Sequence, residues 1–461
     1  MSSPIVTDIA IIGAGTAGIT AFKELGRLGV NALLIDQGPL GTTCARVGCM
    51  PSKAALHAGH QWANLRALLR EEGGTPEGAV TANELWWRAR DMRDLLAGNA
   101  AQRTRSAAGE RLIMGSARFT GPQTLDVEGR QIRARAFIVA TGSRPIVPRV
   151  LAPLGDRLLT TDTLFDLDCL PSSVGLLGLG AIGLEMGLAL ARLGVRVIAG
   201  DMKALPAGIS DPQVGARAIE RFGEELTMWL GHPLEARLSG GAVELHGGSN
   251  TAQVEVVLAA LGRQANVDGL ALDLAGAELD SRGLPAVDPK TLRVAATSVF
   301  LAGDVSGIRP LMHEAADEGV MAARAAAQSL GGRDLALAPR RTPLAIVFTD
   351  PDIVSVGVPY DKLDHDATVI GTAQGSANGR SRVMGAAGNL VRLYAERSSG
   401  RLLGASLIAT HGEHLAHLLA WAIQRGETVE DLLTLPYYHP TIEEMVQSAL
   451  QDAAHQLKEN P

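Results

Sequence analysis

Two of the three cysteines in this 461-residue chain lie close together, in the stretch GTTCARVGCMPSK. Cys44 and Cys49 are five positions apart. On an ideal helix this spacing gives about 7.5 Å along the axis, which exceeds the Cα–Cα range of an unstrained disulfide. A bond between the two sulfurs therefore requires a distorted segment, which Gly48 permits.

The residues that follow the pair favour a reactive thiol. Pro51 suits the first turn of a helix, so Cys49 is expected at a helix N-terminus with Lys53 close by. The helix dipole and a nearby lysine both lower the pKa of a thiol. Two small buried residues, or half of a zinc site, are alternatives, but no second C-x-x-C or suitably spaced histidine pair follows. A redox-active disulfide is the remaining interpretation, and we expect Cys169 to be an ordinary packed thiol.

The composition describes a globular chain that can form sizeable cores. Hydrophobic residues make up 46% and the formal net charge is -7. An acidic chain of this kind argues against a nucleic-acid or anionic-membrane partner, since both favour a basic surface. The start has no basic segment before its apolar run, and no run approaches the roughly 20 residues of a membrane span. We expect a soluble, cytoplasmic protein of two to four domains.

Two stretches predict the elements that position this chemistry. DIAIIGAGTAGITAFKELGRLGVNALLID (8–36) and SVGLLGLGAIGLEMGLALARLGVRVIAGD (173–201) share one plan: an apolar strand, G-x-G-x-x-G, a helix, and a second strand that ends in aspartate. The distance from the first glycine to the aspartate is 23 residues in both. A single G-x-G-x-x-G is a weak signal, but two full strand–helix–strand contexts predict two dinucleotide sites.

Each part of this pattern has a physical reason. The first glycine makes the turn, the second lets the backbone approach a pyrophosphate at the helix N-terminus, and the third allows close helix–strand packing. The terminal acids, Asp36 and Asp201, can accept hydrogen bonds from ribose hydroxyls. Asp201 would repel a 2′-phosphate and favours NAD over NADP, although Lys203 weakens that preference.

Taken together, these motifs resemble the flavin-dependent pyridine nucleotide–disulfide oxidoreductases. The resemblance covers nearly the whole chain, in family order. It rests on GTTCARVGCMPSK, ATGSRP (140–145), GLGAIGLE (178–185), LGR (261–263), FLAGDV (300–305), RPLMHEAADEG (309–319), FTDPDIVSVG (348–357) and YYHPTIEEM (437–445).

The resemblance implies an α/β fold with two Rossmann-like dinucleotide-binding domains, for FAD and NAD, and a C-terminal α+β dimerisation domain. The expected boundaries are 1–147 and 269–338 for the two parts of the FAD domain, 148–268 for the NAD(P) domain and 339–461 for dimerisation. The implied cofactor-binding residues are Gly13, Gly15, Gly18, Asp36, Thr43, Lys53, Gly115, Thr141, Gly142, Ser143, Gly178, Gly180, Ile182, Gly183, Asp201, Gly262, Asp304, Leu311, Met312 and His313. No metal is implied.

The resemblance also implies catalytic roles. Cys49 would be the flavin-side thiol of a Cys44–Cys49 disulfide, and Cys44 the thiol that meets the substrate. Lys53 would lie near the flavin and pair with Glu185. His439 would act as acid/base, oriented by Glu444, and this pair would come from the other subunit of a homodimer.

Local sequence leaves simpler roles open for some of these residues. T-I-E-E from Thr441 is a capping-box pattern, so Glu444 could only cap a helix, and Pro440 could be the first helical residue with His439 as N-cap. Trp86 and Trp87 are expected to pack between helices.

The lipoamide dehydrogenase branch is the most similar, which implies dihydrolipoamide or a lipoyl-bearing protein as the dithiol partner. The chain departs from it at Ala181, in GRQANVDGL and in LPYYHPT, where HAHPT is usual. Mercuric and large thioredoxin reductases are disfavoured because the tail has no cysteine pair, and glutathione-type reductases because they usually use NADP. Alternatives are a related NAD(P)H-dependent disulfide reductase, a transhydrogenase, or a flavin-bound redox sensor or assembly subunit without turnover.

Overall fold

The structure is a computed structural model, and it describes residues 3–71, 80–331, 335–337 and 339–459. The chain divides into two compact units. Unit 1 contains residues 1–51, 89–146 and 262–340, and unit 2 contains residues 52–88, 147–261 and 341–461. Residue 338, expected to end the FAD domain, lies outside the described residues.

Unit 1 is built on a mostly parallel sheet. Its strand order is β3-β2-β1-β6-β5-β4, and β17 also pairs with β6. The pairs among β1, β2, β3, β6 and β17 are parallel, whereas β4, β5 and β6 form an antiparallel meander. The strands are β1 (Ile5–Ile12), β2 (Ala32–Asp36), β3 (Leu112–Met114), β4 (Ala117–Gly121), β5 (Thr124–Val127), β6 (Arg130–Val139) and β17 (Val299–Leu301).

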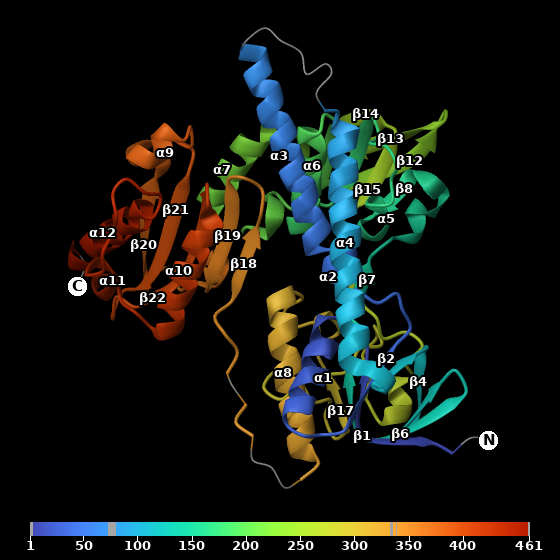
Figure 1. Cartoon of the computed structure of the whole chain (residues 1–461). Coiled ribbons are helices and arrows are strands. Elements are labelled where there is room, and N and C mark those ends of the chain that lie inside the picture. Colours follow the sequence, from blue (N-terminus) through green and yellow to red (C-terminus); the bar gives the residue numbers. More distant parts are fainter. Residues whose placement is uncertain (1–2, 72–79, 332–334, 338, 460–461) are drawn as a thin grey trace. The chain divides into compact units, whose positions relative to one another are not determined.

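Alternation along β1 separates two cores. Ile9 and Ile11 point to one face of the sheet, while Ala10 and Ile12 belong to the core on the other face, as the two-residue period of a strand requires. The first face is covered by α1 (Thr16–Arg27) and α8 (Met312–Ser329), which lie side by side in Figure 1. Their close approach depends on Gly319, since a Cβ there would lie 2.4 Å from the Ala17 carbonyl oxygen.

Short elements complete the parts of unit 1 that carry candidate site residues. Strands β7 (Ser143–Pro145) and β16 (Arg263–Ala265) pair antiparallel. Helix α2 (Thr43–Arg46) precedes α3 (Cys49–Glu71), and α4 (Ala82–Ala108) follows. Helices α3 and α4 each continue from one unit into the other.

Unit 2 contains a second parallel sheet, in the order β11-β10-β9-β15-β8. A three-stranded antiparallel sheet, β12-β13-β14, packs its apolar side chains into the same core. The strands are β8 (Leu158–Thr160), β9 (Ser173–Leu177), β10 (Arg196–Asp201), β11 (Thr227–Leu230), β12 (Leu234–Ser239), β13 (Ala242–Gly247), β14 (Asn250–Val254) and β15 (Val256–Ala259), and the helices are α5 (Thr161–Leu164), α6 (Ala181–Arg192) and α7 (Pro212–Gly223).

The C-terminal part of unit 2 is an antiparallel sheet with helices. The strand order is β18-β19-β22-β21-β20, and α10 and α12 pack on the sheet around one core. The elements are β18 (Leu344–Val347), β19 (Asp352–Gly357), β20 (Thr368–Gln374), α9 (Gly379–Val383), β21 (Leu390–Glu396), β22 (Leu402–Ala409), α10 (Gly412–Arg425), α11 (Val429–Leu433) and α12 (Glu444–Glu459).

A buried polar cluster joins this sheet to the second parallel-sheet region. Asp211, the N-cap of α7, is fully buried. Its Oδ2 accepts from Arg392 Nε at 2.6 Å and from the Tyr394 hydroxyl at 2.7 Å. Burial and the Asp211 carboxylate raise the pKa of Tyr394. Because each member of the cluster has a partner, the cost of burying the charges is offset.

Two expectations about packing need correction. Trp86 is packed as predicted: it is fully buried and stacks on Phe165 with ring centroids 5.7 Å apart. Trp87, however, is 46% exposed, and its indole N–H donates to the Asp168 carbonyl at 2.6 Å. Cys169 is exposed, so the prediction of a packed thiol is wrong. It lies in a surface segment after α5, which buries little around it.

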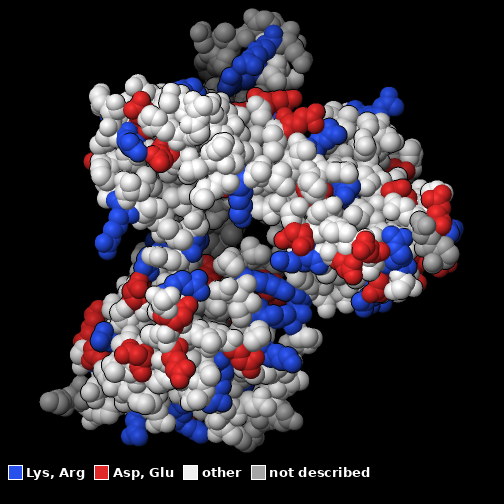
Figure 2. Space-filling model, turned by 180° about the vertical axis from the view of Figure 1, so that it is seen from behind, with Lys and Arg blue, Asp and Glu red and all other residues white. Residues whose placement is uncertain are grey.

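The surface charge is mixed. Figure 2 shows one face of the molecule, on which Lys and Arg side chains alternate with Asp and Glu side chains instead of forming one broad basic surface. In the described parts of the chain, no helix is both long enough and apolar enough to span a membrane.

Candidate functional site

The first glycine turn connects β1 to α1 and is built without side chains. Gly13 has φ +106, and a Cβ there would lie 2.3 Å from the Ala140 carbonyl oxygen. A Cβ on Gly18 would lie 1.9 Å from the Gly13 carbonyl oxygen, so α1 can start this close to the strand only with glycine. Gly15 is the N-cap of α1, and among the described residues no side chain caps that helix start.

Asp36 closes this turn from the end of β2. Its carboxylate accepts the backbone N–H groups of Ala14 and Gly38, both at 2.6 Å. The main chain of Asp36 also accepts the N–H of Gly115 at 2.9 Å. The acid at the end of the second strand is therefore held against the turn.

The second turn, between β9 and α6, repeats the geometry of the first. Gly178 has φ +94, and a Cβ on Gly183 would lie 2.0 Å from the Gly178 carbonyl oxygen. Asp201 accepts the N–H of Leu179 at 2.7 Å, the counterpart of the bond from Ala14 to Asp36. Gly180 is the N-cap of α6, and a Cβ there would meet no described atom within 4 Å.

Both turns therefore fit a dinucleotide pyrophosphate. Each leaves the first N–H groups of a helix without a side-chain cap and without an acid in the first turn, as far as the structure describes them. Such a helix start is suited to an anion. Ile182, in the first turn of α6, is 41% exposed and adds an apolar surface beside the second turn.

A third group of predicted residues is brought together in unit 1 around Asp304. Ser143 Oγ donates to Asp304 Oδ2 at 2.6 Å and accepts from Arg263 Nε at 2.8 Å. Thr141 Oγ1 donates to the Asn266 carbonyl at 2.6 Å. The neighbouring glycines contribute main-chain carbonyls: that of Gly142 accepts from the Asn266 N–H, and that of Gly262 from the Ile146 N–H.

Glu318 holds the turn that carries Asp304, and it was not among the residues predicted from the sequence. Its side chain is completely buried and accepts from the Gly303 N–H at 2.8 Å, from Ser306 Oγ at 2.9 Å and from Arg340 Nη2 at 2.7 Å. Glu318 lies on the buried, alanine-rich face of α8. Because a glutamate is almost never fully buried unless it is paired, an acidic residue on such a face is the signal that could have identified it.

The start of α8 places three predicted cofactor residues at the surface of unit 1. Leu311 is 39% exposed, Met312 is 50% exposed, and His313 is also exposed. Leu311 is the N-cap, so these side chains surround another helix start. They could contact a bound cofactor without rearrangement of the core.

The two cysteines lie in successive short helical segments. Cys44 is in α2, next to the exposed Thr43, and Cys49 is the first residue of α3. The helix that was predicted near Pro51 is therefore confirmed. The segment bends at Gly48, where a Cβ would lie 3.0 Å from the Thr43 carbonyl oxygen and 3.1 Å from the Cys44 Cα. Cys44 is half-buried and Cys49 is exposed.

Lys53 and Glu185 form the expected ion pair, which connects α3 with α6. Lys53 Nζ lies 2.8 Å from each Glu185 carboxylate oxygen. Glu185 is nearly buried, with 6% of its side chain exposed, whereas Lys53 retains 32%. Glu185 also accepts the Phe348 N–H at 3.1 Å, and the Lys53 ammonium lies 4.5 Å from the centre of the Phe348 ring. The lysine ammonium thus contacts both a carboxylate and an aromatic ring.

His439 and Glu444 also meet. His439 Nδ1 lies 3.0 Å from Glu444 Oε1, and Glu444 Oε2 accepts the Thr441 N–H at 2.9 Å. The Thr441 N–H and the imidazole together hold the pKa of Glu444 below its usual value. Helix α12 begins at Glu444, so the alternative in which Pro440 starts a helix is wrong. One carboxylate serves both the backbone and the imidazole.

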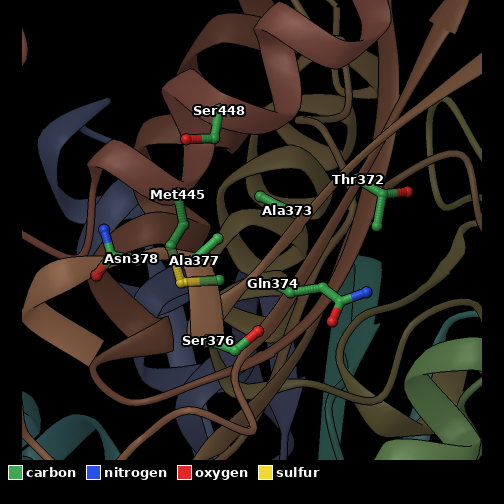
Figure 3. A pocket seen from close by; sticks show the side chains of 8 residues that line it. All are labelled: Thr372, Ala373, Gln374, Ser376, Ala377, Asn378, Met445 and Ser448. Atoms are coloured by element: carbon green, nitrogen blue, oxygen red, sulfur yellow. The ribbon is translucent and has the colours of Figure 1, made fainter. Parts of the chain in front are cut away.

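A hollow of about 270 Å³ lies in the C-terminal part of unit 2 (Figure 3). Its lining consists of Thr372, Ala373, Gln374, Ser376, Ala377, Asn378, Met445 and Ser448. Asn378, one of these residues, donates from Nδ2 to the Thr441 carbonyl at 3.1 Å and so contacts the segment that carries His439. None of the predicted chemical residues lines it.

Two units each assemble part of the predicted set. Unit 1 brings together the first glycine turn, Asp304 and its neighbours, and it carries the two cysteines. Unit 2 contains the second glycine turn, the pair of Lys53 and Glu185, and the pair of His439 and Glu444. In the described residues, no cluster of three or more His, Cys, Asp or Glu side chains is placed to hold a metal ion.

Two dinucleotide turns, a close cysteine pair and a C-terminal α+β domain define a flavoprotein that exchanges electrons between a nicotinamide nucleotide and a thiol–disulfide couple. Residues 7–328 match the family model of the pyridine nucleotide-disulphide oxidoreductases, and residues 344–450 match the dimerisation domain of the same family. The chain belongs to this family and is an enzyme of its flavin-dependent type.

Curated relatives cover nearly the full chain. A dihydrolipoyl dehydrogenase of Halobacterium salinarum is 32% identical over 97% of this chain and 96% of its own length. Another, from Thermus scotoductus, is 31% identical over 96% of each chain.

Solved structures agree on the fold. LpdA from Mycobacterium tuberculosis has a TM-score of 0.83 at 25% identity and covers 96% of this chain and 99% of its own. The flavoprotein disulfide reductase RclA from Escherichia coli has a TM-score of 0.84 at 22% identity, over 98% of this chain and 99% of its own, and supports the fold alone. The expected architecture of two Rossmann-like domains and a dimerisation domain is confirmed.

Proposed function

We propose that this enzyme oxidises dihydrolipoamide, or a lipoyl-bearing protein, with NAD⁺ as the final acceptor. The observation that carries the proposal is the close pair of Cys44 in α2 and Cys49 at the start of α3, in a chain whose full-length curated relatives include dihydrolipoyl dehydrogenases. The net reaction converts a dithiol and NAD⁺ into a disulfide, NADH and one proton.

The thiol chemistry proceeds in two exchanges. A substrate thiolate attacks the Cys44 sulfur of the oxidised pair, the Cys44–Cys49 bond breaks, and Cys49 leaves as a thiolate. The second substrate sulfur then attacks the first, which releases the substrate disulfide and Cys44. Cys49 is well placed to leave because a helix N-terminus stabilises a thiolate.

His439 takes the proton from the attacking substrate thiol. An imidazole titrates near neutral pH, so it can accept this proton and return it. Glu444 accepts from Nδ1, which leaves Nε2 as the acceptor nitrogen, and its lowered pKa keeps it ionised. In this proposal His439 serves the cysteines of the other subunit of a homodimer.

FAD, when bound, supplies the two-electron step between the cysteine pair and the nicotinamide. Gly13, Gly15 and Gly18 would hold its pyrophosphate, Asp36 its ribose, and Asp304 its ribityl chain. The ion pair with Glu185 would hold the Lys53 ammonium at the flavin and compensate its charge.

NAD is favoured over NADP by Asp201. Its carboxylate at the end of β10 would accept ribose hydroxyls and repel a 2′-phosphate. Lys203 donates its main-chain N–H to Asp201 Oδ1 at 2.9 Å. We also propose a cytoplasmic location, where NAD(H) and a reducing thiol pool are available.

An anaerobic titration of the purified holoenzyme with dihydrolipoamide tests the proposal. Wild type should show a change in flavin absorbance, followed by NADH formation when NAD⁺ is added. Cys44→Ser and Cys49→Ser should lose turnover, whereas Cys169→Ser, a matched change at an exposed cysteine, should retain it. A flavin that NADH reduces but dihydrolipoamide does not would discard this substrate in favour of a related disulfide reductase.

A further inference from the structure

The segment between α11 and α12 carries His439 and is held at several points. The Tyr437 hydroxyl donates to the Leu432 carbonyl at 3.3 Å. Thr441 Oγ1 donates to the Tyr438 carbonyl at 2.8 Å, and Asn378 reaches the Thr441 carbonyl. The backbone on both sides of His439 is therefore held by hydrogen bonds.

Two large apolar side chains on this segment face solvent. Tyr438 is 81% exposed and Leu435 is 53% exposed, whereas the adjacent Tyr437 is half-buried. An aromatic ring buries about 150–250 Å² when it packs, so an exposed ring directly beside the proposed acid/base offers a substrate an apolar surface. Tyr438 directly precedes His439, which is itself 77% exposed at its side chain.

The chain segment that carries this ring has no positive charge of its own. Residues 426–457 contain no lysine or arginine. The same stretch contains the acids Glu427, Glu430, Asp431, Glu443, Glu444 and Asp452. A dithiol with a carboxylate near its sulfurs would be repelled here, while a neutral hydrocarbon chain would not.

We propose that Tyr438 is a specificity-determining residue whose ring packs against the hydrocarbon part of a neutral dithiol while a sulfur of that dithiol reaches His439. The inference rests on the proposed function and adds the substrate class: a neutral, apolar dithiol of the dihydrolipoamide type. The tyrosine hydroxyl is not required, because the contact is with the face of the ring.

Steady-state kinetics of the holoenzyme, expressed per bound flavin, test this inference with two probes. Dihydrolipoamide has a hydrocarbon chain, and dithiothreitol is a short dithiol without one. Tyr438→Ala should lower kcat/KM for dihydrolipoamide about tenfold, mainly through KM, and that for dithiothreitol less than about twofold. Tyr438→Phe should behave as wild type. Trp421→Ala removes a ring of α10 that is 62% exposed, and it should leave the ratio between the two dithiols unchanged.

Charge gives a second, independent measurement. Tyr438→Arg should raise the preference for anionic dihydrolipoate over dihydrolipoamide at least about tenfold, since it adds the first cation to an acidic segment. Sedimentation velocity of each variant checks whether the ring is instead covered by a second copy of the chain.

The outcomes separate the inference from the proposed function. Equal losses for both dithiols, with or without dissociation of a dimer, would overturn the role of Tyr438 and leave dihydrolipoamide oxidation intact. An unchanged ratio in Tyr438→Ala would do the same. A wild-type enzyme whose flavin is reduced by NADH but which oxidises no dithiol would overturn both.

Discussion

Removal of the charge of Glu185 should loosen α3 and α6 together. In Glu185→Gln the side chain keeps its shape and one oxygen acceptor, but Lys53 loses its counter-ion. Lys53 Nζ lies 2.8 Å from Glu185 Oε1. At an effective dielectric constant near 20, the Coulomb attraction between these two charges is about 6 kcal/mol before desolvation is considered. Net values for hydrogen bonds to charged groups are about 1.5–3 kcal/mol. Because Lys53 is 32% exposed, we expect about 2 kcal/mol, or a factor of about 30 in the local opening equilibrium.

Hydrogen exchange followed by mass spectrometry measures this loss without requiring reversible global unfolding. Peptides from the N-terminal half of α3 and from α6 should exchange about 30-fold faster in Glu185→Gln. The Phe348 amide, which donates to Glu185, should lose protection as well. Peptides of β12–β14, in the same unit, serve as the internal reference.

A matched control and a double mutant complete the experiment. Glu220→Gln removes a carboxylate that is 68% exposed and paired with Arg217. It should change the free energy of local opening, as measured by hydrogen exchange, by less than about 0.5 kcal/mol. Lys53→Met combined with Glu185→Gln should reveal a coupling energy of about 1–2 kcal/mol. If Glu185→Gln exchanges like Glu220→Gln, the pair contributes nothing to local stability and the reasoning is refuted.

Three other substitutions test separate parts of the molecule. Hydrogen bonds from Arg27, opposed by burial, bring the pKa of Glu24 from 4.5 to about 2. Because the pKa is lower in the folded state, the ionised carboxylate stabilises the fold above pH 4.5, and this stabilisation is lost as the pH falls toward 2. Glu24→Gln should therefore lower the free energy of unfolding, measured by chemical denaturation, by about 2 kcal/mol at pH 7 and by less at pH 4. A deficit that stays constant between these pH values would contradict this. Gly183→Ala should abolish NADH binding in a fluorescence titration, because its Cβ would lie 2.0 Å from the Gly178 carbonyl oxygen. Gly180→Ala should retain the circular dichroism of the wild type, because a Cβ there meets no described atom within 4 Å. Asp211→Asn should cost about 3 kcal/mol and lower the calorimetric Tm by roughly 5 °C or more, and an unchanged Tm would refute a structural role for the buried cluster.

The two glycine turns are predictable from sequence because their requirements are local. A Cβ at Gly18 or Gly183 would lie about 2 Å from a carbonyl oxygen five residues earlier in the chain. No other residue type can replace glycine at such a distance, so the motif and the geometry imply each other. The acids Asp36 and Asp201 follow from the length of a strand–helix–strand unit.

The contacts that hold Asp304 could not be predicted in this way. Ser143, Arg263 and Glu318 come from three distant parts of the chain, and each residue type is common in any sequence. Only the folded sheet brings these side chains together. Lys53 and Glu185 are 132 positions apart, and such a separation carries no periodic signal. Their pairing could therefore be expected only from the family resemblance.

The exposure of neighbouring side chains on one helix was also difficult to predict. Trp86 and Trp87 are identical in type and adjacent in sequence, yet one is fully buried and the other 46% exposed. Adjacent helical positions differ by about 100° in direction, so only one of the two rings can face Phe165. A pattern of residue types along the helix does not state which of the two it will be.

The acidic residues of the candidate sites have a common property that bears on how they act. Asp36, Asp201, Glu318 and Glu444 each accept a backbone N–H. Their carboxylates are thus oriented before any ligand binds, and the entropy of fixing them is not lost again at binding. Substitution by the amide keeps one oxygen acceptor but puts a donor in place of the second oxygen, which in Asp36 also accepts a backbone N–H. Amide variants should therefore keep the fold while they lose ligand affinity, whereas alanine variants should lose both, because the backbone N–H is then left without its partner.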